Sequence, residues 1–148
     1  MPQVVAAVVT DIWREKLARI YAGDTSLGGF SVPATFKIGE GGWEDILSVR
    51  QPKVPDPTLT DIEADGVTQY FFSKALTAPN LTFTSPTRLQ ISCIVATSEA
   101  NVNLGGDPPE FYELGVFDAA GNLLVYSTFP VEIKTLSKTL QHLIYVDF

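Results

Sequence analysis

Cysteine and histidine are nearly absent from the sequence, which has one residue of each, Cys93 and His142. A single cysteine excludes a disulfide bond within the chain. A single histidine, remote from Cys93 in sequence, argues against a cysteine nucleophile and against histidine-rich metal sites. Cys93 lies among β-favouring residues, so we expect it to be a small buried hydrophobe.

Positive charge is also scarce, because 10 Lys and Arg stand against 17 Asp and Glu, for a net charge of −7. Phosphate binding needs clustered Lys and Arg, so this balance argues against nucleic acid as the main partner. It argues equally against a basic helix on a membrane surface. Charged residues make up 18% of the chain, against about 25% in typical soluble domains. Two explanations of this low charged fraction are open. Either partner subunits cover part of the exterior, or a β-rich surface carries Ser and Thr in place of Lys and Glu.

Long hydrophobic runs are missing as well. The apolar N-terminus, residues 1–10, is too short to span a membrane and lacks the positive residues of a signal peptide. We therefore expect no membrane partner, and we expect folding in a cytoplasm. With 148 residues, the chain is expected to form a single domain over 1–148 that can bury a core.

The most informative stretch that is present runs from Phe111 to Phe129. Two apolar, β-favouring segments flank Asp118-Ala119-Ala120-Gly121, and this composition is typical of a type I turn with a left-handed glycine. We predict a central β-hairpin here, whose second arm is broken by Pro130 and is followed by extended chain over Val131 to Thr135.

A helix is predicted over about 10–22, with Thr10 or Asp11 as N-cap and Gly23 beyond its end. Trp13, Leu17 and Tyr21 share one helix face with Ile20. An aromatic patch for a partner is possible, but packing on a sheet is the preferred interpretation. Residues 4–9 either extend this helix or form an edge strand.

Residues 24–57 are predicted to be rich in loops. Phe36 and Ile38 indicate a short strand that leads into Gly39-Glu40-Gly41-Gly42. No Gly-Lys-Ser/Thr follows, so close packing or positive φ is favoured over a phosphate-binding loop. Three prolines in 51–57 predict an irregular arm, either at a subunit contact or on the free surface.

A loose cluster of four acidic residues begins in this arm with Asp56 and continues beyond it with Asp61, Glu63 and Asp65. Calcium is the natural ligand to consider, since oxygen ligands at alternate positions can surround a hard cation. The twelve-residue loop pattern with its terminal Glu is absent, so a solvated acidic loop is favoured. We predict no metal and no other cofactor.

The chain from 68 onward is predicted to form strands, including alternating segments over 81–84 and 88–96 and a C-terminal strand over 138–148 that is covered on both sides. The expected fold is mainly β, an antiparallel β-sandwich over about 68–148 with one N-terminal α-helix.

Two segments, Phe36-Lys37-Ile38-Gly39-Glu40-Gly41-Gly42 and Tyr112-Glu113-Leu114-Gly115-Val116-Phe117-Asp118-Ala119-Ala120-Gly121-Asn122-Leu123-Leu124, resemble the N-terminal region of phage tail-collar fibre and baseplate fibre proteins. The resemblance covers most of the chain and implies a structural part of the virion near the tail tip, usually trimeric. Fibre proteins of this kind usually continue into a long shaft, and this sequence ends at Phe148. That difference favours a compact adaptor, baseplate or collar subunit, and a phage-derived contractile injection system is an alternative.

Three function classes follow from these observations. The structural class expects subunit contacts, as a homotrimer and with other tail subunits, through Val54, Pro55, Leu140, Ile144, Val146 and Phe148. A carbohydrate-binding sandwich would use Trp13, Trp43 or Tyr70 for stacking on sugars. An enzyme would need two marked carboxylates, and only Glu113 stands out, as the acid inside the apolar hairpin. We expect no catalysis and no small-molecule substrate, and location in the virion tail after assembly in the host cytoplasm.

Overall fold

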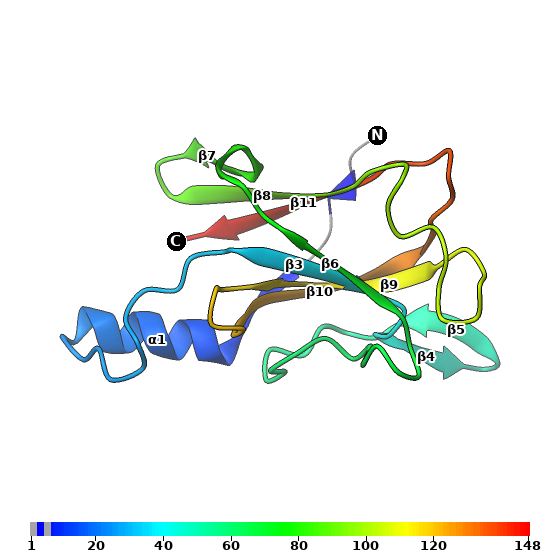
Figure 1. Cartoon of the computed structure of the whole chain (residues 1–148). Coiled ribbons are helices and arrows are strands. Elements are labelled where there is room, and N and C mark those ends of the chain that lie inside the picture. Colours follow the sequence, from blue (N-terminus) through cyan, green and yellow to red (C-terminus); the bar gives the residue numbers. More distant parts are fainter. Residues whose placement is uncertain (1–2, 5–6) are drawn as a thin grey trace.

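The computed structural model describes residues 3–4 and 7–148 (Figure 1). The chain is mainly β with one α-helix in the described ranges, as the sequence predicts. Its strand pairs are antiparallel, except that residues 3–4 pair in parallel with residues 142–143. One sheet has the strand order β1-β11-β8-β7, a second has the order β2-β10-β9-β3-β6, and β4 and β5 form a separate ribbon. The elements are β1 (Gln3–Val4), β2 (Ala7–Val9), α1 (Asp11–Tyr21), β3 (Thr35–Gly39), β4 (Trp43–Ile46), β5 (Val49–Pro52), β6 (Phe71–Ala75), the 3₁₀-helix η1 (Ala78–Asn80), β7 (Leu81–Ser85), β8 (Arg88–Val95), β9 (Glu110–Phe117), β10 (Leu123–Ile133) and β11 (Leu140–Asp147).

The main core fills the space between the two larger sheets. Alternate residues of β8 are buried, as its sequence pattern predicts: Leu89, Ile91, Cys93 and Val95. The five-stranded sheet contributes Phe36, Ile38, Leu114, Val116 and Leu124 to the same cluster. The core therefore depends on strands from both halves of the chain.

The strand β11 differs from its prediction. Leu140, Ile144 and Val146 are at most 3% exposed and belong to the main core. Leu143 and Tyr145, on the opposite face, are only half-buried. The strand is therefore fully covered on one face. The three core side chains join the sheets and are not on the surface, where they were expected to contact other subunits.

The helix α1 lies within the predicted range. Thr10 is the N-cap, and its hydroxyl oxygen accepts a bond from Trp13 N (3.4 Å) and donates to Leu123 O (2.6 Å). Trp13 is buried, whereas Tyr21 is 82% exposed, so sheet packing accounts for only part of the helix face. For residues 4–9, the structure favours strand over helix, because Ala7–Val9 pair with β10; residues 5 and 6 lie outside the described residues.

The central hairpin is formed by β9 and β10 around the predicted turn. Asp118 Oδ1 accepts bonds from Ala120 N (3.0 Å) and Asn122 N (2.8 Å), and Gly121 has a φ of +89°. Pro130 interrupts the pairing of the second arm but lies within β10, which continues as extended chain to Ile133. The β9–β10 register shifts between Thr128 and Glu132. Such a bulge leaves residues out of the ladder, so a proline there costs no paired N–H.

A second hairpin, β4–β5, was not predicted. Its strands pair Trp43 with Pro52 and Ile46 with Val49. The turn residues Leu47 and Ser48 have φ values of +51° and +65°, the backbone of a type I′ turn without its usual Asn or Gly. The irregular arm therefore begins after Pro52, the last residue of β5. A proline is tolerated there because β5 is an edge strand.

Candidate functional site

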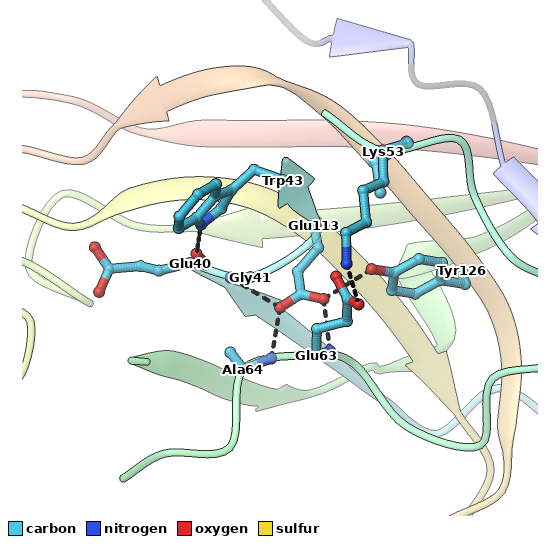
Figure 2. A network of polar contacts seen from close by, with 9 residues as sticks. Glu40, Gly41, Trp43, Lys53, Glu63, Ala64, Glu113 and Tyr126 are labelled. Carbon is cyan, nitrogen blue, oxygen red and sulfur yellow. Dashed lines mark hydrogen bonds and ion pairs between the residues drawn. The ribbon is translucent and has the colours of Figure 1, made fainter. Parts of the chain in front are cut away.

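Glu113 is fully buried and accepts four hydrogen bonds from the protein (Figure 2). Its Oε2 accepts from Gly41 N (3.0 Å) and Ala64 N (2.8 Å). Its Oε1 accepts from Glu63 N (2.7 Å) and from the Tyr126 hydroxyl (2.9 Å). One carboxylate thus joins β9 to β10, to the turn after β3 and to the loop before β6.

Strand pairing brings these groups together. Glu113 lies opposite Gly39 in the β3–β9 ladder, and Tyr126 lies opposite Gly115 in the β9–β10 ladder. The loop before β6 crosses this region and buries Ile62 and Ala64 in a second cluster with Phe117, Leu123 and Tyr126. Apolar packing therefore holds the backbone donors in place beside the carboxylate.

The glycine-rich turn is explained by close packing around Glu113. A Cβ atom on Gly41 would lie 2.5 Å from Glu113 Oε2 and 2.8 Å from Ala64 N, and one on Gly39 would lie 2.7 Å from Oε2. Gly42 has a φ of +80°, and a Cβ there would lie 2.8 Å from the Glu113 Cβ. The turn surrounds the carboxylate of its own chain, so the close-packing interpretation is confirmed.

Burial dominates the electrostatics of this site. Burial raises the pKa of the Glu113 carboxyl, although the bonds from Glu63 N, Ala64 N and the Tyr126 hydroxyl act in the opposite direction. Burial, followed by the charge of Glu113, raises the pKa of Tyr126, so its hydroxyl keeps its proton and remains a donor. Four protein donors from separate segments bind this one carboxyl group, and this arrangement suits a structural joint between segments.

The six expected contact residues are not gathered at one place. Val54 is 87% exposed, Phe148 is 56% exposed and Pro55 is half-buried. Leu140, Ile144 and Val146 are in the core, as described above. Val54 follows the β4–β5 ribbon, whereas the C-terminus lies at the α1 end of the molecule (Figure 1).

The acidic residues of the 56–65 region each have their own partners. Asp61 pairs with Lys37 at 3.2 Å, and Glu63 pairs with Lys53 at 2.8 Å. The Asp65 carboxylate accepts from the backbone N–H groups of Val67, Thr68 and Gln69. Within residues 3–4 and 7–148, no group of three or more His, Cys, Asp and Glu is placed to hold a metal ion.

The structure brings together Cys93 and His142, which the sequence separates, as a cross-strand pair of β8 and β11. The thiol is buried, and burial raises the pKa of Cys93, which disfavours the thiolate. His142 is also buried, with its ring tilted against that of Phe129 at a centroid distance of 4.6 Å and its Nε2 3.0 Å from Glu132 Oε2. The pairing is therefore part of a packed interior.

The three aromatic residues considered for sugar stacking are already packed. Trp13 is 3% exposed. Trp43 donates from Nε1 to Glu40 O at 2.8 Å, and the Arg50 guanidinium lies 3.8 Å from the centre of its ring. Tyr70 stacks on Phe111 with ring centres 6.1 Å apart. The structure therefore does not gather these rings into a stacking surface.

A feature that the sequence analysis missed is an apolar groove of about 310 Å³ between α1 and the edge of the four-stranded sheet. Its lining includes Tyr21, Phe30, Val32, Phe83 and Phe148. These five side chains are each more than half exposed. The sequence signal that could have indicated this groove is the lack of charged residues in 25–36 and 75–87. These two segments contain Phe30, Val32 and Phe83.

No family model, curated protein or solved structure matches this chain. In the part of the chain that the structure describes, no helix combines the length and the apolar character that a membrane crossing requires.

Proposed function

We propose that this chain is a structural subunit of a bacteriophage tail, a baseplate or tail-fibre adaptor that acts by assembly and not by catalysis. The observation that carries the proposal is the contact between Gly41 and Glu113. It joins residues 36–42 and 112–124, the two segments that resemble tail-collar fibre proteins. Residues 35–39 also pair with 113–117 in adjacent strands. The two segments therefore form one structural unit.

The chemistry of Glu113 supports assembly over catalysis. A catalytic carboxylate must reach a substrate, and this one is buried with both oxygens bonded to protein donors. The exposed apolar side chains around the groove are suited to subunit contacts. The proposed partners are other tail subunits and further copies of the chain, as a homotrimer, in the virion after assembly in the host cytoplasm.

The test is gold labelling of intact purified phage particles with an antibody raised against this chain, viewed by electron microscopy. Label at the tail tip or fibre base supports the proposal. Label on the head or neck contradicts the placement in the tail. Label on headless, tail-like particles supports a phage-derived contractile injection system instead.

A blot of denatured particles is the control for a buried epitope. If the chain is absent from that blot and free in the lysate, the proposal is wrong. A soluble binding protein for host-surface glycans then becomes the leading alternative, and added glycans that quench tryptophan emission would support it.

A further inference from the structure

Strand β7 is an exposed sheet edge without charged residues. In the described parts of the chain, the edges of the two larger sheets are β1, β7, β2 and β6. β1 has two residues and β2 has three. β6 carries Lys74, which pairs with Glu99 at 2.8 Å. β7 has five residues, Leu81-Thr82-Phe83-Thr84-Ser85, and lacks the charged residues and prolines with which proteins protect many edges. Its ladder with β8 is regular from Leu81 to Phe83 and irregular between Phe83 and Ser85.

Phe83 shows that the inner face of this edge is uncovered. It pairs with Leu89 across the β7–β8 ladder, so the two side chains point to the same face of the sheet. Leu89 is 7% exposed in the core, but Phe83 is 66% exposed. An aromatic residue on the core side of a sheet is thus left in solvent, in the lining of the groove that Phe148 also lines.

The distribution of charge indicates which partner can approach this edge. The chain carries a net charge of −7, so two copies repel each other at most orientations. Residues 75–87, which contain β7, and residues 25–36, which contain Phe30 and Val32, have no charged side chain. Two negatively charged copies can therefore meet at these segments without placing like charges next to each other.

We propose that β7 pairs in an antiparallel manner with β7 of a second copy, about a two-fold axis beside Phe83. The two four-stranded sheets then become one continuous sheet. Phe83 then lies opposite Phe83 of the second copy. Aromatic pairs are among the stabilising cross-strand combinations, and the same patch serves both copies, as two-fold contacts require.

The contact concerns self-association of the purified chain and does not rest on the tail assignment. Alone it gives a dimer. Combined with a three-fold contact that leaves β7 free, it gives a hexamer of two trimers. The expected oligomer therefore has an even number of copies in either case.

The experiment measures the mass of the purified full chain by sedimentation equilibrium, with Phe83→Glu and Phe83→Lys variants. The wild type is expected to have the mass of a dimer or hexamer. Each variant places like charges opposite each other, so each alone is expected to have half that mass. An equimolar mixture pairs Glu with Lys and is expected to restore the wild-type mass.

Leu136→Glu is the matched control, because Leu136 is 76% exposed and lies in the loop between β10 and β11. It is expected to keep the wild-type mass, and circular dichroism checks that each variant is folded. A wild-type monomer or plain trimer overturns the proposal. An even oligomer that persists in the Phe83→Glu variant also overturns the proposal. If the mixture of the two variants does not restore the wild-type mass, the Phe83–Phe83 register is wrong.

Discussion

At the scale of single residues, Glu113 and Asp65 are two carboxylates with opposite dependence on pH. Burial raises the pKa of Glu113, so the folded state keeps its proton to higher pH than the unfolded state does. Its contribution to stability therefore falls as pH rises through that interval. Asp65 is exposed, and three backbone N–H groups lower its pKa to about 2. Its contribution is present above the unfolded pKa and is lost at acid pH.

Replacing Glu113 by Gln is expected to lower the free energy of unfolding by about 3 kcal/mol. The amide group of Gln has only one acceptor oxygen. Its NH₂ group would face N–H or O–H groups that donate hydrogen bonds to the carboxylate in the wild type. Urea unfolding measures the change. Glu110→Gln, an exposed position at the start of the same strand, is the control and should change stability by less than about 0.5 kcal/mol. Equal effects of the two variants would contradict the role of the buried acceptors.

Replacing Asp65 by Asn is expected to flatten the acid limb of the stability curve. The folded pKa of about 2 lies below the ordinary value of 3.8, so the wild type loses stability as pH falls through this window. The variant lacks the titrating group and should lose less. Unfolding curves at several pH values between these two limits test this. If stability falls with pH equally in the wild type and the variant, Asp65 does not cause the loss of stability at acid pH.

At the scale of elements, the sequence predicted those whose signals are local. The hairpin of β9 and β10 was predictable because Asp118 and Gly121 define its turn within four residues. The β4–β5 ribbon was missed because Leu47 and Ser48 do not belong to the usual turn residues. The partners of Glu113 were missed because Gly41, Glu63 and Ala64 are 72, 50 and 49 positions away, and no local pattern encodes such contacts.

The turn between β3 and β4 can be tested with an added methyl group. Gly41→Ala is expected to cost about 3 kcal/mol, since its Cβ would meet both the Glu113 carboxylate and the Ala64 backbone. Gly105→Ala is the control, because its nearest contact would be an ordinary 3.5 Å. That variant should change stability by less than about 1 kcal/mol. Thermal unfolding compares them, and a neutral Gly41→Ala would contradict the close packing.

At the scale of the whole molecule, one core joins the sheets, and a second cluster joins the loop before β6 to the central hairpin. We expect cooperative unfolding in a single transition. Trp13 reports on α1 and the main core, and Trp43 reports on the β4–β5 ribbon. Variants that keep only one tryptophan should each show the same urea midpoint by fluorescence and by far-UV circular dichroism. Different midpoints within one variant would show that the ribbon unfolds separately.

The position of β1 and β2 has a consequence for synthesis. β1 pairs with β11, where Gln3 is opposite His142, and β2 pairs with β10, where Val9 is opposite Val125. Among the described strands, the first two to be translated therefore pair with the last two. Neither sheet can be completed on a nascent chain that stops before β10, and the final closure of the sandwich follows the synthesis of its last strand.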